Sequence, residues 1–217
     1  MLPLLIEHDH AAHDVLVAVV AAAVAGEVAA TYLGQARSGQ RRLVGSVAEA
    51  LFLRQRGDAT AADRWTKQIL VASVVAGFGA AYAVAAHEPG LRAFANSWDT
   101  LVVGAAVALF GVGLRSWAVW TLGRFFRREV TVEAGQRVVR SGPYRWIRHP
   151  AYTGNLLTFA GIGLALGSWV SAAVLLAVSF AGHLPRIHVE EAELERSFGV
   201  EYRDYERTTA RLIPGVW

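Results

Sequence analysis

The chain has 217 residues, of which 54% are hydrophobic and only 18% are charged. Soluble domains carry about 25% charged residues, and the apolar residues here are gathered in long runs, so an ordinary soluble domain is excluded. The sequence contains no cysteine, which excludes disulfides, thiolate metal sites and cysteine nucleophiles.

Apolar runs long enough to cross a bilayer follow one another along the chain. Crossing about 30 Å of hydrocarbon takes about 20 mostly apolar residues in a helix. The runs cover residues 15–34, 69–86, 98–122, 151–166 and 169–184. Only Gly167 and Ser168 separate the last two, which predicts a tight C-terminal helical hairpin. We expect an all-α, polytopic membrane helical bundle of five transmembrane helices; a four-span arrangement that merges or drops part of the hairpin is the alternative.

The tract before the first run contains acids and histidines but no Lys or Arg. A signal peptide needs a basic start, so the first run is predicted to be a retained span. The tract could hold a metal ion, but a terminal segment without a rigid frame is better interpreted as an exposed polar cap. Its polar residues are Glu7, His8, Asp9, His10, His13 and Asp14.

The distribution of the 21 Lys and Arg residues predicts which helix ends share one side of the membrane. Seven lie in residues 37–67, seven in 124–148 and five from 186 onward, whereas Arg92 alone falls in a connection on the opposite side. By the positive-inside rule, the N-terminus is outside and the basic loops and the C-terminus are cytoplasmic. We expect a protein of a bacterial-type inner membrane. Its partner is the lipid bilayer and not nucleic acid, because basic loops beside anionic lipids explain the charge.

Two charged residues fall inside the apolar runs, Glu27 in the first and Arg115 in the third. Ionisable groups inside a membrane usually face a partner or a cavity. We expect a structural role for Glu27, whereas a structural role and a substrate contact are equally good interpretations of Arg115. Residues 43–53 are predicted to form a helix lying on the membrane surface.

Glycine pairs inside the runs resemble fragments of a dinucleotide-binding loop, but none follows a strand within a βαβ unit. Small residues let membrane helices approach closely, so helix packing is the better interpretation. The pairs are Gly77/Gly79, Gly111/Gly113 and Gly161/Gly163.

The stretch 141–154, S-G-P-Y-R-W-I-R-H-P-A-Y-T-G, lies directly against the fourth run. Residues before proline avoid the α region, so the chain should be extended or turned until a helix starts with a proline in its first turn. An interfacial aromatic belt with basic anchors is the alternative to a ligand site here. In the ligand-site interpretation, backbone N–H groups at the helix start are free to meet a ligand, beside Tyr144, Trp146, His149 and Tyr152.

A second polar patch, residues 186–195, follows the last run, and the hairpin places it on the same side of the membrane as the first. Arg186 and Glu190 stand at i and i+4, so they share one helix face. The alternative is a solvated helix with one surface ion pair of little energetic value. Together, the two patches predict a ligand site.

These residues resemble the isoprenylcysteine carboxyl methyltransferase family. The similar motifs are G-P-Y-R-x-x-R-H-P-x-Y-x-G at 142–154, R-x-x-x-E-E at 186–191, F-G-x-E-Y-x-x-Y at 198–205 and R-L-I-P at 211–214, together with segments around Arg115 and 121–123. The resemblance covers about residue 98 to the C-terminus. We expect a single integral membrane domain, with N-terminal spans and an interfacial helix in 1–97 and a catalytic, cofactor-binding half in 98–217.

The resemblance implies an enzyme that binds S-adenosylmethionine in a cytoplasmic pocket of its C-terminal half. It implies that Arg186 and Glu190 are catalytic and that Arg186 faces the methyl acceptor, with Arg115 as a second candidate for substrate binding. No metal site is expected. Gly135-Gln136 departs from the Gly-His that is frequent in the family, which leaves the role of Gln136 open. The implied cofactor contacts are Gln136, Arg137, Val138, Val139, Tyr144, His149, Pro150, Ala151, Tyr152 and Glu190.

The chemistry of methyl transfer agrees with these residues. Displacement at a sulfonium methyl group is in-line and needs alignment and a dry pocket more than acid–base machinery. A carboxylate acceptor is already ionised at neutral pH, so Arg186 need only orient it by a bidentate bond. A thiol or phenol acceptor would need a base, for which His149, His188 and Glu191 are options. We therefore expect carboxyl O-methylation of an isoprenylcysteine-like or other lipophilic acceptor.

Two other functions fit the sequence less well. An NADPH-dependent membrane enzyme like the sterol reductases would have a similar C-terminal half, but those proteins usually lack the Gly-Pro-Tyr and paired-Glu pattern. A non-enzymatic small transporter or scaffold would favour charges or broken helices at the midplane, which only Glu27 approaches. The identity of the acceptor and the oligomeric state do not follow from the sequence.

Overall fold

The computed structural model describes residues 14, 17–18, 20–22, 25–26, 61–87, 97–126 and 137–215. The described residues before 27 are helical, and the regular elements that follow are helices with an isolated parallel bridge between Ile147 and Ala210. The elements are α4 (Ala61–His87), α5 (Ser97–Leu122), η2 (Gly123–Phe125), η3 (Gly142–Arg145), α6 (Pro150–Ala165), α7 (Trp169–Phe198) and α8 (Val200–Thr208).

Four of the apolar runs correspond to helices α4 to α7. Three of these helices are long and apolar enough to cross a membrane, over residues 65–84, 98–122 and 169–198, while α6 has 16 residues. The first apolar run as a whole, Glu27, Gln136, the surface helix predicted at 43–53 and the polar tract up to His13 lie outside the described residues. A membrane bundle of helices is therefore confirmed for the described chain, and five spans remain a prediction.

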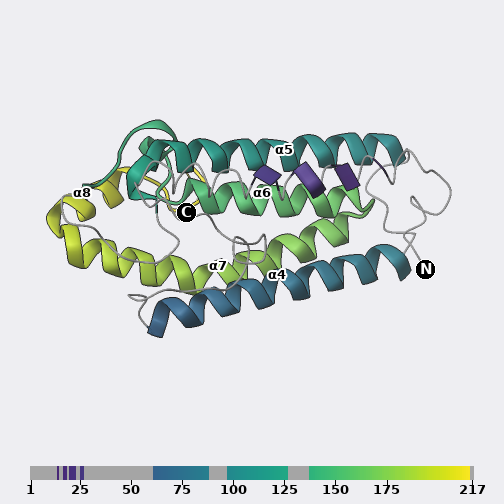
Figure 1. The fold of residues 1–217 in the computed structure, drawn as a ribbon, viewed down its shortest axis with the longest axis horizontal. Coiled ribbons are helices and arrows are strands. Elements are labelled where there is room, and N and C mark those ends of the chain that lie inside the picture. Colours follow the sequence, from purple (N-terminus) through teal and green to yellow (C-terminus); the bar gives the residue numbers. More distant parts are fainter. Residues whose placement is uncertain are drawn as a thin grey trace.

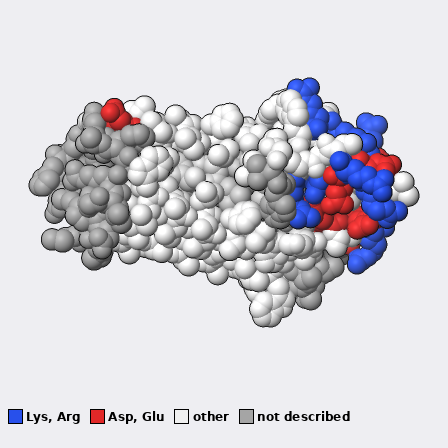
Figure 2. Space-filling view, turned by 180° about the vertical axis from the view of Figure 1, so that it is seen from behind, with Lys and Arg blue, Asp and Glu red and all other residues white. Residues whose placement is uncertain are grey.

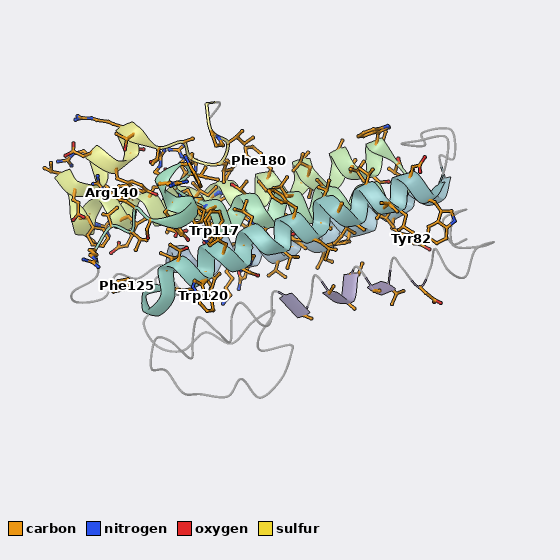
Figure 3. All side chains as sticks on the ribbon, turned by 90° about the horizontal axis from the view of Figure 1, so that it is seen from above. Tyr82, Trp117, Trp120, Phe125, Arg140 and Phe180 are labelled. Atoms are coloured by element: carbon orange, nitrogen blue, oxygen red, sulfur yellow. The ribbon has the colours of Figure 1, made fainter. Side chains whose placement is uncertain are left out.

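The last apolar run ends at residue 184, but the helix that contains it is longer. Helix α7 continues to Phe198 with Pro185 inside it. Its extension is held by packing, because Ile187 forms a buried cluster with Leu156 and Leu212. Phe180 packs against the same cluster and is labelled in Figure 3. The polar patch 186–195 is thus part of the same helix as the apolar run.

The four long helices lie side by side in the order α4, α7, α6, α5 (Figure 1). Successive helices run in opposite directions, so the start of α4, the end of α5, the start of α6 and the end of α7 gather at one end of the molecule. Figure 2 shows Lys, Arg, Asp and Glu side chains crowded at this end, which we call the charged end. A broad white belt separates it from a small acidic patch near the other end.

The surface between the two ends is rich in large apolar side chains. Phe110 is 66% exposed, Val75 60% and Trp120 56%, and all three belong to long helices. A contiguous apolar belt of this kind in water would favour association, whereas lipid tails solvate it. The exposed apolar surface therefore agrees with a bundle that sits in a bilayer.

Glycines let α5 and α6 touch backbone to backbone. A Cβ built on Gly111 would lie 2.5 Å from the carbonyl oxygen of Gly154, and Gly104 and Gly161 face each other in the same way. The predicted packing role is confirmed for Gly77, Gly111, Gly161 and Gly163. At Gly79 and Gly113, by contrast, no atom of the described residues lies within 4 Å of a Cβ built there, so the structure gives no close contact for these two.

The predicted hairpin between α6 and α7 is confirmed. Gly167 turns the chain with a φ of 92°, a conformation that glycine adopts without a steric cost. Ser168 then caps α7, because its side chain accepts a hydrogen bond from the Ser171 N–H at 3.3 Å. The turn lies at the end opposite to the charged end, so both helices lead back to the same place.

Candidate functional site

A turn opens the site between α5 and α6. Ser141 is extended, Gly142 has a φ of 57°, and Pro143 and Tyr144 are buried in the short helix η3. The Tyr205 hydroxyl of α8 donates to the Tyr144 carbonyl at 2.7 Å and so fixes this turn to the C-terminal region. The prediction of an extended or turned chain before α6 is confirmed.

The C-terminal segment 209–212 runs parallel to 146–149 and straps the start of α6. The Arg148 N–H donates to the Ala210 carbonyl at 2.8 Å, and the His149 N–H donates to the Arg211 carbonyl at 3.1 Å. In return, the Ala210 N–H donates to the Trp146 carbonyl at 3.1 Å. Two segments about 60 residues apart in the sequence therefore form one unit.

The backbone at the start of α6 is less available to a ligand than the sequence predicts. Pro150 has no N–H, and the His149 carbonyl accepts hydrogen bonds from the N–H groups of Tyr152 at 3.0 Å and Thr153 at 3.1 Å. The expectation of free N–H groups is wrong for these two residues, because the N-cap carbonyl turns back to satisfy them. Side chains supply most of the chemistry of the site.

Tyr152 joins the two residues that the sequence places on one face of α7. Its hydroxyl donates to Glu190 Oε2 at 2.7 Å and accepts a hydrogen bond from Arg186 Nε at 3.0 Å. Arg186 is buried, whereas one third of the Glu190 side chain is exposed. The predicted shared face is confirmed, and the tyrosine from α6 makes it one hydrogen-bonded unit.

Glu191 forms the centre of a second, buried cluster. Its Oε1 lies 3.0 Å from Arg148 Nε, 3.1 Å from His149 Nε2 and 3.1 Å from Arg211 Nε. The terminal nitrogen NH2 of Arg211 also lies 2.7 Å from Glu191 Oε2. One carboxylate therefore ties α7 to both paired segments, 146–149 and 209–212, through two arginines and a histidine.

His149 links the two clusters. Its imidazole ring stacks on Tyr152 with centroids 5.5 Å apart, and its Nδ1 lies 3.9 Å from Glu190 Oε2. His149 is buried and does not face solvent, so its ring serves to orient the tyrosine. Burial and the nearby charge of Glu190 raise the pKa of Tyr144 well above its usual value, so this side chain remains a neutral phenol.

Comparison with known proteins matches residues 102–196 to the sequence model of the isoprenylcysteine carboxyl methyltransferase family. Residues 102–196 are thus similar to this family. Protein-S-isoprenylcysteine O-methyltransferase A of Arabidopsis thaliana is 32% identical over 130 residues, which are 59% of this chain and 64% of that protein. The protein-S-isoprenylcysteine O-methyltransferase of Saccharomyces cerevisiae is 31% identical over 59% of this chain and 56% of that protein.

The isoprenylcysteine carboxyl methyltransferase fold is also found by structure. The chain superposes on the solved structure of a eukaryotic intramembrane Ras methyltransferase of this family with a TM-score of 0.69, at 22% identity, over 93% of this chain and 65% of the other. The nickel-cobalt-cadmium resistance protein NccN of Alcaligenes xylosoxydans is 32% identical over 55% of each chain. The chain thus spans at most about two thirds of the proteins it matches.

The other residues implied by the family lie around the same end. Arg115 NH1 lies 3.5 Å from the Ala151 carbonyl, next to the start of α6. Arg137 is exposed and Val138 and Val139 are half-buried in the extended chain before η3. His188 is exposed and its Nδ1 lies 2.7 Å from the Leu184 carbonyl of its own helix, so the structure does not bring it into the cluster.

Sequence reasoning missed the central position of Glu191 and the strap that it holds. A signal was present, because Arg148 stands close to a proline and an apolar run, where a buried cation needs an anion. It also missed His183, whose ring packs edge-on against Tyr152, and Asn155, whose amide lies 3.5 Å from the His183 ring. Both are isolated polar residues in apolar runs, which is the usual sign of a functional position in a membrane helix.

Proposed function

We propose that the chain is a membrane-embedded S-adenosylmethionine-dependent methyltransferase, acting on the carboxylate of an isoprenylcysteine-like or other lipophilic acceptor. The observation that carries the proposal is the hydrogen-bonded unit of Arg186, Tyr152 and Glu190 at the charged end. In this unit a guanidinium and a carboxylate are bridged by a single tyrosine hydroxyl. The unit lies in a region that is similar to a methyltransferase family. The acceptor site and the cofactor site would meet at Tyr152.

The residues present suit the proposed cofactor. S-adenosylmethionine carries positive charge on its sulfur and amino group, and when bound it would supply the methyl group. The partly exposed carboxylate of Glu190 can hold a cationic or hydroxyl group, and the rings of the buried Tyr144 and the half-buried Tyr152 can pack against apolar parts. The backbone at 137–139, which belongs to no helix or strand, offers further hydrogen-bonding groups.

Arg186 would orient the acceptor. Its Nε is engaged by Tyr152, which fixes the plane of the guanidinium, and its terminal nitrogens match a carboxylate in a bidentate pair. An ionised carboxylate needs no base before it attacks a methyl group. This residue would therefore contribute alignment, the largest requirement of an in-line displacement.

We propose that the charged end faces the cytoplasm of a bacterial-type inner membrane, in a five-span arrangement. Lys and Arg side chains of the described residues crowd at this end (Figure 2), and such residues are retained on the cytoplasmic side. The family match favours methyl transfer over the reductase and transporter alternatives. The chain is also 32% identical to a metal-resistance protein over 55% of its length, so likeness alone does not specify the acceptor.

Binding and turnover on the full chain in lipid nanodiscs test this function. Labelled S-adenosylmethionine should bind, and methyl groups should transfer to an S-farnesylated, N-acetylated cysteine. Glu190→Ala should abolish cofactor binding, whereas Arg186→Ala should raise the acceptor KM by tenfold or more at unchanged cofactor affinity. Glu193→Gln, in an exposed ion pair of the same helix, is the matched control and should change neither. Cofactor binding retained by Glu190→Ala would defeat the assignment of that residue.

A further inference from the structure

A line of polar residues continues from the proposed site into the apolar part of the bundle. On α7, Ser179, His183 and Arg186 stand at i, i+4 and i+7, which places them along one helix face. On α6, Tyr152 and Asn155 stand at i and i+3 and meet this face. We call Asn155, Ser179 and His183 the polar seam.

The polar seam lies where α6 and α7 separate. Near their hairpin the helices are in backbone contact, because a Cβ built on Gly163 would lie 2.5 Å from the Ala172 Cα. Toward the charged end the two ribbons diverge (Figure 1), and the side chains of Tyr152, Asn155 and His183 lie between them. Side chains, which rearrange more easily than backbones, therefore form the contact along this part of the interface.

His183 presents one ring nitrogen to its own helix and the other to the amide of Asn155. Its Nδ1 lies 2.7 Å from the Ser179 carbonyl, so this nitrogen carries the proton and Nε2 is an acceptor. Nε2 lies 3.5 Å from the Asn155 amide nitrogen, at the long limit of a hydrogen bond. A ligand hydroxyl could make a shorter bond to either group, because it can donate to Nε2 or accept from the amide.

The Ser179 hydroxyl supplies an independent indication of a ligand. The residue is fully buried, and among the described residues its Oγ has no hydrogen-bond partner. An unpaired buried hydroxyl bears the full desolvation cost, and polar groups at depth in a membrane bundle usually serve function. By contrast, Ser171 on the same helix donates to the Ala81 carbonyl at 2.8 Å, so its hydroxyl is explained by packing against α4.

We propose that the polar seam is a second subsite for the methyl acceptor, which takes a neutral hydrogen-bonding group on the acceptor's chain. The inference rests on the proposed function, in which Arg186 holds the acceptor carboxylate. His183 and Ser179 precede Arg186 by three and seven residues, or about 4.5 and 10.5 Å along the helix. An extended chain covers roughly 1.2 Å per bond, so the second polar group belongs about four to nine bonds from the carboxylate. The preferred acceptors are thus amphiphilic lipids, in place of plain hydrocarbon acids.

Matched acids test the subsite in the full chain in nanodiscs. The probes are hexadecanoic acid and the same acid with one hydroxyl at carbon 7 or at carbon 15, measured both by Kd and by methyl release. Wild type should prefer the carbon-7 acid over the plain acid about three- to tenfold, the value of one hydrogen bond, and should not prefer the carbon-15 acid.

Two serine variants of α7 separate this role from a structural one. Ser179→Ala should remove the preference without lowering stability, because it deletes an unpaired hydroxyl. Ser171→Ala should lower stability slightly and keep the preference. Asn155→Leu should also remove the preference and leave the cofactor affinity unchanged.

The outcomes distinguish the subsite from the proposed function. Equal Kd values of wild type for the plain and carbon-7 acids would overturn the subsite, and so would a preference that survives Ser179→Ala and Asn155→Leu. A Kd preference without any methyl release would support the subsite while the proposed reaction fails. Loss of cofactor binding in Asn155→Leu would show that the seam acts on the cofactor site, which also contradicts the proposal.

Discussion

Removing the charge of Glu191 should destabilise the protein more than neutralising any other single carboxylate of α7. Glu191→Gln keeps the shape of the side chain but leaves Arg148, His149 and Arg211 around a neutral amide. The Glu191 side chain is 11% exposed and that of Arg148 only 8%. Breaking a buried ion pair by neutralising one partner costs about 3–5 kcal/mol, because uncompensated charge stays buried.

The matched control is Glu193→Gln two residues away. Glu193 pairs with Arg196, whose side chain is 76% exposed, and such surface pairs contribute about 0–1 kcal/mol. For a chain of this size, 1 kcal/mol corresponds to about 2–4 °C in Tm, so Glu191→Gln should lower the Tm by about 6–20 °C and the control by at most about 4 °C. Thermal unfolding followed by tryptophan fluorescence in detergent measures both.

Limited proteolysis adds a local readout of the same change. Glu191 holds Arg211, so its loss should release the strap 209–212 and expose the peptide bond after Arg207. Cleavage there should be faster in Glu191→Gln than in Glu193→Gln at a temperature where both are folded. Equal melting temperatures and equal cleavage rates in the two variants would refute the assignment of Glu191 as the anchor of the strap.

Three further substitutions, the last with a matched control, test other contacts. Tyr152→Phe removes the hydroxyl between the guanidinium and the carboxylate and should lower methyl release about ten- to hundredfold while the Tm changes little. Tyr205→Phe deletes the bond to the Tyr144 carbonyl and should cost about 1 kcal/mol by thermal unfolding. Gly111→Ala should cost about 1–3 kcal/mol because its Cβ meets backbone, whereas Gly113→Ala should be neutral or stabilising; equal effects would contradict the packing of α5 on α6.

The helices could be predicted because hydrophobic length is a local property of the sequence. The runs at 98–122 and 151–166 correspond to α5 and α6 within two residues, and the hairpin follows from Gly167 and Ser168. The end of α7 could not be placed in this way. Residues 185–198 look like a polar segment, and their helix is stabilised by packing of Ile187 against distant parts of the chain.

The site could be predicted in part for the same reason. Arg186 and Glu190 share a face by helical spacing, and the stretch around His149 and Tyr152 is conspicuous by its prolines. The contacts of Glu191 are non-local, since its partners lie 20 to 43 residues away, and no periodicity reports them. The backbone N–H groups of Tyr152 and Thr153 are not free, because the N-cap carbonyl of His149 accepts hydrogen bonds from both.

The strap imposes an order on the assembly of the site. Arg148 donates hydrogen bonds to the carbonyls of Glu206 and Thr209, the latter 61 residues further along the chain. Arg148 is therefore made before its partners, and the charged end cannot close until residues 206–212 have been added to the chain. In Figure 3, Arg140 lies beside α8 at this late-closing end, where it donates to the Glu201 carbonyl. A chain stopped just after α7 would therefore lack these partners of Arg148, and its charged end would stay open.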